Sequence, residues 1–218
     1  MTPTAFDSAA LAVSDTASEA AAAAPAVALT IAGSEATGGA GAQADLKTFQ
    51  ELGVFGIANL TCIVSFDPQD NWNHRFVPID QQVIADQLEA TTAAYGAASG
   101  APSALDTVKI GMLGSPATIS TVAAVLAGAA FKNVVLDPVL ICKGQEPGHA
   151  LDTDQALKAQ ILPLATFVTP NHFEAESLSG LQITDVDSLT AAASEHPAPE
   201  TAASPTFGAD RTSSVSPS

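Results

Sequence analysis

Residues 28–49 read ALTIAGSEATGGAGAQADLKTF, and this stretch decides the fold. A short apolar run, residues 28–32, ends at Gly33 and is followed by a loop of small residues that holds three further glycines. A segment that suits a helix begins directly after the loop. Glycine lets the main chain come close to a ligand in φ/ψ regions that other residues avoid. The order of strand, glycine loop and helix therefore indicates an α/β enzyme with a small ligand at the loop.

Apolar, β-branched runs alternate with helical patterns along the rest of the chain. The expected strands are residues 28–32, 57–64, 107–113, 134–136 and 166–169. Helices are expected between them, with Asp80 and Ser115 as N-caps, and glycines at 53 and 180 end two of them. The helix after Asp80 is expected to pack through Val83, Ile84, Leu88 and Thr91. Such alternation implies βαβ units, so the predicted fold class is α/β, a doubly wound, mostly parallel sheet flanked by helices.

One domain is predicted, at residues 26–194. Residues 1–25 are an Ala/Ser/Thr-rich leader without the basic region of a secretory signal, and we expect this leader to be disordered. Residues 195–218 are rich in Ser, Pro and Ala and show no periodicity, so a disordered tail is expected there as well.

The composition excludes several classes of function. Seven basic residues against 23 acidic ones give a formal charge of −16, which repels phosphate backbones and anionic lipid. We therefore expect no nucleic acid and no membrane among the partners, and no apolar run reaches membrane-spanning length. The two cysteines, Cys62 and Cys142, stand in no CxxC or His-spaced pattern. That argues against a disulfide framework or a structural zinc site and fits a cytoplasmic protein.

Polar and glycine residues gather where the predicted strands end. They are Ser34, Asp67, Gly111, Asp137 and Asn171. In doubly wound sheets, ligands bind in the crevice outside the carboxyl ends of the strands. This coincidence is the physical basis for predicting an enzyme.

The glycine loop also matches a dinucleotide-binding pattern, because residues 39–44 read GAGAQA and satisfy G-x-G-x-x-A. In a NAD-binding fold the first glycine lies at the strand end, whereas six residues separate Ala32 from Gly39. No acid ends a second strand at about 20 residues further on. A P-loop is excluded as well, since the chain has no GK[ST], and a NAD site is not favoured.

Four segments in a fixed order carry a family resemblance. They are residues 28–49, KIGMLGS at 109–115, VVLDPVLICKG at 134–144 and ATFVTPNHFEAESLSG at 165–180. From about Ala26 to Leu189 the chain resembles the hydroxymethylpyrimidine/pyridoxal kinases of the ribokinase-like superfamily. The resemblance implies a ribokinase-like sheet, an ATP-dependent kinase that uses Mg²⁺, and a homodimer when the chain is complete.

Two substrate classes occur within this family. The hydroxymethylpyrimidine kinases carry a Gln at the position of Phe66, and an apolar side chain cannot replace the hydrogen bonds that a Gln makes to the pyrimidine. Residues 63–79, IVSFDPQDNWNHRFVPI, look instead like the Gram-positive pyridoxal kinases of this fold. We therefore expect phosphorylation of the hydroxymethyl group of a B6 vitamer: pyridoxal, pyridoxine or pyridoxamine. The alternatives are the pyrimidine kinase of thiamin synthesis and a non-catalytic relative that binds a ligand.

The resemblance also implies a set of substrate-binding residues. They are Gly33, Glu35, Phe66, His74, Met112 and Cys142. Cys142 would act as a lid residue that engages the substrate aldehyde, and Lys143 beside it could lower its pKa. Glu35 stands where the family has Asp, so its carboxylate reaches one methylene further. The structural alternatives are that Cys142 is a small buried side chain and that His74 lies in an exposed loop.

A second group would serve ATP and Mg²⁺. Asp137, Asn171 and Glu174 would orient the phosphates, with Asp137 and Glu174 holding Mg²⁺ through water. The structural alternative is that Asp137 lies in a turn and Asn171 caps a helix.

The resembled kinases continue past Leu189 with a K-G-G motif and a G-[AT]-G-C segment. The helix that this segment opens forms the anion hole for the transferring phosphoryl group. Neither motif occurs in this chain, so the sheet is expected to be truncated on its C-terminal side. We expect the 218-residue chain to show little or no kinase activity, which a coupled ATP assay with pyridoxal would test.

Overall fold

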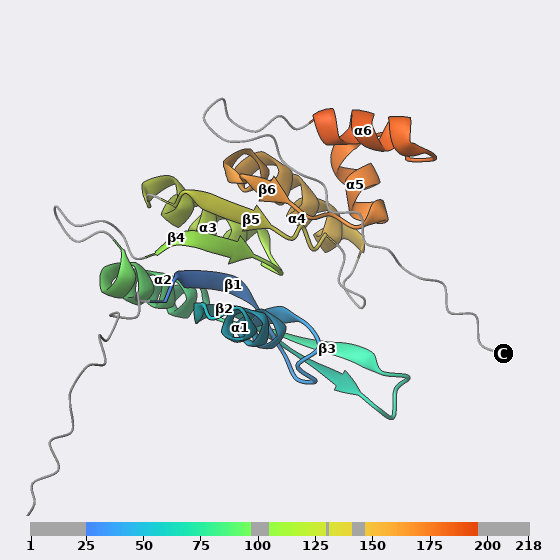
Figure 1. Ribbon diagram of the computed structural model, residues 1–218. Helices are drawn as coiled ribbons and strands as arrows, with labels where there is room; N and C mark the ends of the chain where they lie inside the picture. Colours follow the sequence, from blue (N-terminus) through green and yellow to red (C-terminus); the bar gives the residue numbers. More distant parts are fainter. Residues whose placement is uncertain (1–24, 97–104, 130, 141–146, 196–218) are drawn as a thin grey trace, which may run out of the picture.

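The computed structural model describes residues 25–96, 105–129, 131–140 and 147–195, and these form a sheet with helices on both faces (Figure 1). The elements are β1 (Val27–Glu35), α1 (Gly41–Glu51), β2 (Phe55–Asp67), β3 (Asn73–Pro78), α2 (Gln81–Tyr95), β4 (Leu105–Ile110), α3 (Pro116–Gly128), β5 (Asn133–Leu136), α4 (Pro147–Gln160), the 3₁₀ turn η1 (Leu162–Leu164), β6 (Phe167–Val168), α5 (His172–Ser179) and α6 (Val186–Ser194). The leader and the tail fall almost wholly outside the described residues.

The strands of the described sheet follow the order β3-β2-β1-β4-β5-β6. The pairs from β2 to β6 are parallel, and β3 runs antiparallel at the edge. β1 pairs with β2 on one side and with β4 on the other, so the chain order reverses between β1 and β4. Such a reversal opens a crevice beyond the carboxyl ends of these strands. The predicted α/β, mostly parallel architecture is confirmed.

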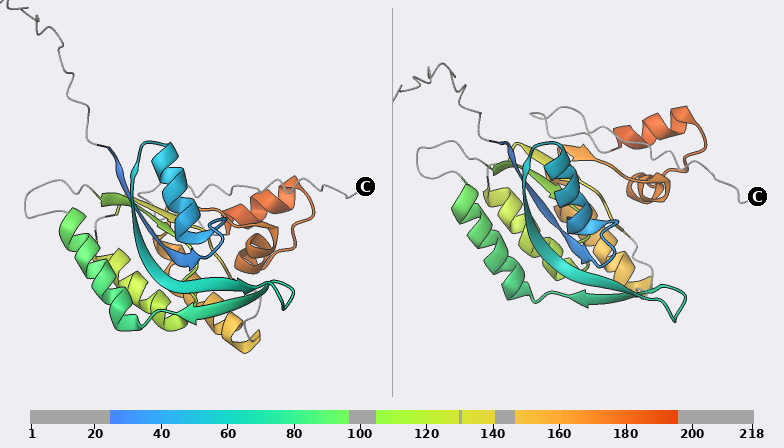
Figure 2. Two further views of the ribbon diagram at one scale, coloured as in Figure 1. Left: turned by 90° about the horizontal axis from the view of Figure 1, so that it is seen from below. Right: turned by 60° about the horizontal axis from the view of Figure 1, so that its bottom comes forward.

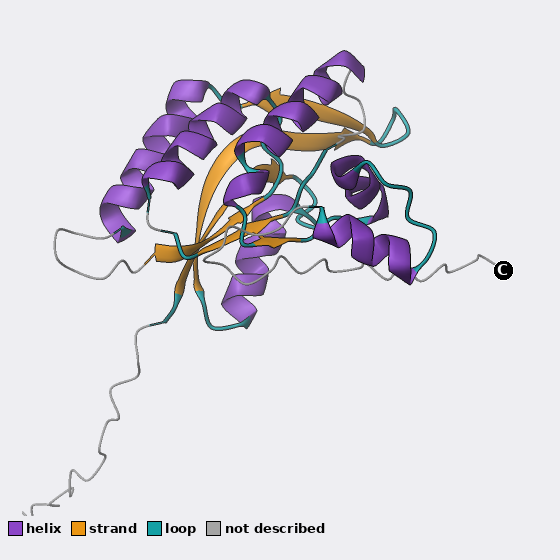
Figure 3. Cartoon of the chain, turned by 90° about the horizontal axis from the view of Figure 1, so that it is seen from above, coloured by secondary structure: helices purple, strands orange, loops and turns teal. Residues whose placement is uncertain are grey.

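The helices divide between the two faces of the sheet. α1 packs on β1 and β2, whereas α2, α3 and α4 lie side by side on the opposite face. Figure 2 shows this division in both of its views, and Figure 3 shows the row of three helices from another side. The main core lies between that row and the sheet, where side chains such as Ile31, Val108, Ile84 and Ile119 are fully buried. Strands buried on both faces read as continuous apolar runs, which is why the sequence pattern was clear.

Most predicted helix ends are confirmed by hydrogen bonds or backbone angles. The Asp80 carboxylate accepts the N–H of Gln82 at 2.9 Å, and the Ser115 hydroxyl accepts the N–H of Thr118 at 3.2 Å. Gly180 has a φ of +73° at the end of α5, a conformation that favours glycine.

Three features differ from the sequence-based expectation. β3 was not predicted, because WNHRFVP has no clean alternation and gains its partners only from β2. α6 was not predicted either; its start depends on a capping box between Asp185 and Ser188 rather than on an apolar stripe. Val83 was expected to pack with the core, but 49% of it is exposed while Ile84 and Leu88 are buried.

Within the described ranges, no helix combines the length and the apolar character needed to cross a membrane.

Candidate active site

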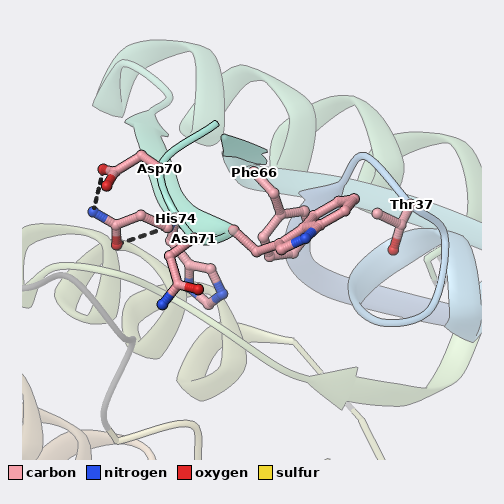
Figure 4. Close-up of a pocket in the computed structure, with 7 residues that line it drawn as sticks. Thr37, Phe66, Asp70, Asn71 and His74 are labelled. Atoms are coloured by element: carbon pink, nitrogen blue, oxygen red, sulfur yellow. Dashed lines mark hydrogen bonds between the residues drawn. The ribbon is translucent and has the colours of Figure 1, made fainter. Parts of the chain in front are cut away.

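Two adjoining cavities open beside the glycine loop, and both are lined by Thr37, Phe66 and His74. The inner cavity measures about 430 Å³ and lies over the carboxyl ends of β1, β4 and β5. The outer cavity, about 690 Å³, is lined by the turn between β2 and β3 (Figure 4). Both volumes fall within the range of small-molecule sites, roughly 300–1,000 Å³.

The inner cavity brings together most of the residues that the sequence proposed. Its lining includes Gly33, Glu35, Phe66, His74, Met112 and Asp137. Two others, Asn171 and Glu174, lie at the start of α5 and do not line it. Cys142 and Lys143 lie outside the described residues.

The glycine loop packs back on the end of β1. Gly41 has a φ of +61°, and a Cβ atom there would lie 2.3 Å from the carbonyl oxygen of Gly33. Gln43 then fixes the approach, since its Nε2 donates to the Ser34 hydroxyl at 2.6 Å and its Oε1 accepts the Glu35 N–H at 3.0 Å. The sequence requires glycine at this point because two backbone segments touch.

The Glu35 carboxylate is directed into the loop. It accepts the N–H of Thr37 at 2.7 Å and the hydroxyl of Thr37 at 2.8 Å. It also accepts the N–H groups of Gly39 at 3.0 Å and Ala40 at 3.3 Å. The hydrogen bond from the Thr37 backbone is the main reason that the pKa of Glu35 lies below its usual value. Glu35 therefore organises the loop, and its contact with a substrate ring stays a prediction.

The floor of the cavity is made of sulfur and small residues. Met112 Sδ lies 3.6 Å from Cys62 Sγ, and the Thr61 hydroxyl donates to the Met112 carbonyl at 2.6 Å. A Cβ at Gly33 would lie 2.6 Å from Cys62 Sγ, so glycine is needed here as well. Cys62 is fully buried, and burial raises the pKa of its thiol.

An aromatic pair forms the wall that the two cavities share. Phe66 on β2 and His74 on β3 are directly paired across the strands. Their ring centroids are 4.9 Å apart and the planes are inclined by 71°, an edge-to-face arrangement (Figure 4). The turn that joins the two strands places Asn71 and Trp72 at positive φ, 48° and 58°. His74 is half-buried in this wall, and its contact with a substrate stays a prediction.

Lys109 was not proposed as a site residue, yet it lines the inner cavity. Its Nζ lies 3.2 Å from Asp45 Oδ2 and 3.2 Å from Asp137 Oδ2. The signal in the sequence was a lysine inside the apolar strand DTVKIGM, where a charge needs a partner. Its partners could not be read from the sequence, because they depend on the order of β1, β4 and β5.

Asn171 and Glu174 form a reciprocal capping box. The Asn171 side chain accepts the N–H of Glu174 at 3.0 Å, and the Glu174 carboxylate accepts the N–H of Asn171 at 2.9 Å. The structural alternative for Asn171, a helix cap, is therefore present, and the predicted role toward ATP remains untested. Burial is the main cause that raises the pKa of Glu174, and the charge of Asp137 adds to it.

The donor set near α5 fits a hydrated Mg²⁺ ion better than a fully protein-bound one. No group of three or more His, Cys, Asp or Glu side chains able to hold a metal occurs in the part of the chain that the structure describes. Asp137 and Glu174 repel each other, and a divalent cation near both would relieve that repulsion. Mg²⁺ commonly binds through one or two carboxylates with water and substrate phosphates.

Known proteins with similar sequences are vitamin kinases. The sequence profile of the phosphomethylpyrimidine kinase family matches residues 35–201. A pyridoxine kinase of Bacillus subtilis is 47% identical over 171 residues, which cover 76% of this chain and 59% of the relative. A hydroxymethylpyrimidine/phosphomethylpyrimidine kinase of Haemophilus influenzae is 43% identical over 165 residues, 76% of this chain and 58% of the relative. The chain thus spans less than two thirds of the length of these relatives.

Solved structures agree with the sequence matches. The pyridoxal kinase of Staphylococcus aureus in complex with pyridoxal gives a TM-score of 0.68 at 40% identity, covering 79% of this chain and 59% of that one. An ADP complex of Bacillus subtilis pyridoxal kinase gives 0.68 at 44% identity, with 79% and 62% covered. Together with the glycine loop, the apolar cavity and the strand-end carboxylate, these matches show that the chain belongs to the phosphomethylpyrimidine kinase family, which has a ribokinase-like fold.

Proposed function

We propose that the inner cavity binds a B6 vitamer, whose hydroxymethyl group is phosphorylated by ATP. The observation that carries the proposal is the convergence of an aromatic wall (Phe66 and His74), an apolar floor at Met112 and a charged end at Lys109 and Asp137 in one cavity. A flat pyridine ring fits the apolar part, and its polar substituents then face the charged end. Apolar walls with a few placed polar groups are typical of such sites.

The chemistry is a phosphoryl transfer. The hydroxymethyl oxygen forms a bond to the γ-phosphorus of ATP, the bond from that phosphorus to the β,γ-bridging oxygen breaks, ADP leaves, and the hydroxyl proton is released. This reaction needs positioning and charge neutralisation more than covalent help from the protein. Asp137, Asn171 and Glu174 would hold the nucleotide end, with Asp137 and Glu174 facing a hydrated Mg²⁺ that neutralises phosphate charge.

Pyridoxal is favoured over the pyrimidine because of Phe66. Its ring is packed edge-to-face with His74 and offers no hydrogen bond to a pyrimidine edge. A site that lacks such a partner leaves the polar groups of that ligand unpaired. The second candidate, hydroxymethylpyrimidine, is supported by the family profile and by the Haemophilus influenzae relative.

Cys142 is proposed to react with the aldehyde of pyridoxal, which a pyrimidine alcohol does not possess. A cytoplasmic homodimer of the complete protein belongs to the same proposal, and light scattering measures its mass.

The test is ligand binding to the purified 218-residue chain. Thermal shift and calorimetry with pyridoxal, pyridoxine, hydroxymethylpyrimidine and a non-hydrolysable ATP analogue with MgCl₂ separate the candidates. We expect both vitamers to bind more tightly than the pyrimidine, and pyridoxal to produce the ultraviolet change of a hemithioacetal. Tighter binding of the pyrimidine would replace the first candidate with the second. Binding of vitamers without any effect of the ATP analogue would favour a non-catalytic binding protein.

A further inference from the structure

Lys109 occupies an unusual place for a cation in so acidic a chain. It lies on β4 and bridges Asp45 on α1 to Asp137, which follows β5. About a fifth of its side chain is exposed, and it lines the inner cavity. Among the described residues that line this cavity, it is the one Lys or Arg.

The ammonium group is shared between its two partners and not saturated by them. Both N–O distances are 3.2 Å, longer than the roughly 2.7–2.9 Å of strong charge-assisted hydrogen bonds. A lysine ammonium has three N–H donors, so two carboxylates leave capacity for a third acceptor. The Thr30 hydroxyl donates to Asp45 Oδ2 at 2.6 Å, which fixes Asp45 independently of Lys109.

The local backbone leaves room for this ammonium. A Cβ atom at Gly111 would lie 3.0 Å from Lys109 Nζ and 3.1 Å from the Cβ of Ala32. A side chain at Gly111 would therefore crowd the lysine ammonium, which would have to shift slightly. The glycine of the K-x-G sequence serves the placement of the charge.

Lys109 lines the same cavity as the proposed ring-binding residues and lies beside Asp137 at its charged end. Phe66, His74 and Met112 form the part suited to a ring, and Asp137 marks the other end. A group that a ring substituent carries toward Asp137 meets Lys109. Most of the remaining lining is apolar, which strengthens the attraction between a cation and an anion there.

We propose that Lys109 binds the phosphoryl group once it is on the vitamer, so that the cavity accepts the phosphate monoester as well as the free alcohol. This inference rests on the proposed function. A phosphate monoester carries a charge of about −1.5 to −2 at neutral pH. Lys109 is the one Lys or Arg among the described residues of the lining, so its charge offsets the repulsion between the ester and Asp137.

The experiment compares pyridoxine with pyridoxine 5′-phosphate by calorimetry at constant MgCl₂. Neither ligand has an aldehyde, so no imine with a lysine complicates the result. Lys109→Met keeps the length of the side chain and removes its charge. We expect it to weaken binding of the phosphate ester by about 10- to 100-fold and binding of pyridoxine by less than about threefold.

Two variants serve as controls. Lys109→Arg keeps the positive charge and is expected to retain most of the affinity for the ester. Lys132→Met removes a lysine that is 75% exposed and paired with Asp106 at the amino ends of β4 and β5, and it should leave both affinities unchanged. If Lys109→Met does not fold, the double variant Asp45→Asn/Lys109→Met neutralises one of the two carboxylates that lose their lysine partner.

The inference and the proposed function fail in different ways. Equal weakening of the alcohol and the ester in Lys109→Met, or no weakening of the ester, overturns the role of Lys109 while the vitamer site stands. If wild type binds neither pyridoxine ligand, inorganic phosphate is the probe. If phosphate stabilises the wild type but not Lys109→Met, the anion site at Lys109 is supported without the vitamer. If phosphate stabilises both proteins equally, the anion site at Lys109 is overturned.

Discussion

The carboxylate of Glu35 receives hydrogen bonds from three residues of the glycine loop, and this decides what it can do. A contact with a substrate ring would compete with bonds that hold the loop closed. The sequence analysis named Glu35 as a substrate-binding residue, and Glu35 lines the inner cavity. The hydrogen-bond partners of Glu35 could not be predicted from the sequence, because they depend on how the glycine loop folds around the carboxylate.

Glu35→Gln tests this role through its pH dependence. The pKa of Glu35 is lowered in the folded state, so its charge stabilises the fold above the unfolded pKa of about 4.3, and this contribution is lost as the pH falls through the folded pKa. We expect the variant to be less stable than wild type at pH 7, with a difference that shrinks below about pH 4. Urea unfolding measures it, with the exposed Glu51→Gln as control. A difference that grows on acidification contradicts the role.

The charge of Glu174 affects stability with a pH dependence opposite to that of Glu35. Burial and Asp137 raise its pKa, so the folded state disfavours its charge, and wild type loses stability as the pH rises from the unfolded value, about 4.3, through the folded pKa. Glu174→Gln keeps an acceptor for the Asn171 N–H and removes that charge. We expect it to match or exceed wild type in stability at pH 8, with no advantage below about pH 4, and to lose affinity for a Mg²⁺-bound ATP analogue. Glu89→Gln on the exposed side of α2 is the control, and unchanged nucleotide affinity would exclude Glu174 from the site.

At the level of elements, local chemistry explains which parts were predictable. Asp80 and Ser115 cap their helices through contacts within three residues, which a linear sequence reveals. β3 depends on its hydrogen bonds with β2 across a turn, and Val83 on α2 is 49% exposed although the adjacent Ile84 is buried. Local caps followed by an apolar helical pattern could be predicted, whereas β3 depends on its pairing with β2, and α6 was missed although its Asp185–Ser188 capping box is local.

Because the glycine loop touches β1, substitution of Gly41 by alanine should affect stability very differently from substitution of Gly128. Gly41→Ala places a Cβ at positive φ and 2.3 Å from the Gly33 carbonyl oxygen, so we expect a loss of roughly 2 kcal/mol or more. Gly128→Ala, at the end of α3, meets no atom within 4 Å and should be neutral or stabilising by up to about 1 kcal/mol. Chemical denaturation compares the two variants. Equal effects would show that the loop tolerates rearrangement at Gly41.

At the scale of the whole molecule, the site exists because the sheet order brings distant strand ends together. Gly33, Met112 and Asp137 are far apart in sequence, and each lies near the carboxyl end of a different parallel strand. The general rule about parallel sheets predicted a ligand site at strand ends that include Asp137, whereas Gly33 and Met112 were named from the family resemblance. The sequence did not predict that Lys109 joins Asp45 to Asp137, because that bridge requires β4 to lie between β1 and β5.

The large negative charge of the chain should make its thermal stability depend on salt. With a formal charge of −16, repulsion among carboxylates opposes the compact state. Raising NaCl from about 0.01 M to about 0.1 M shortens the Debye length from about 30 Å to about 10 Å, so the Tm should rise. Choline chloride at the same ionic strength should give the same rise, because screening does not depend on the identity of the cation. Calorimetry with both salts measures it. A rise in Tm with sodium alone would indicate a specific cation site. A fall in Tm would contradict the prediction, because it would mean that ion pairs such as those of Lys109 stabilise the fold more than the overall repulsion destabilises it.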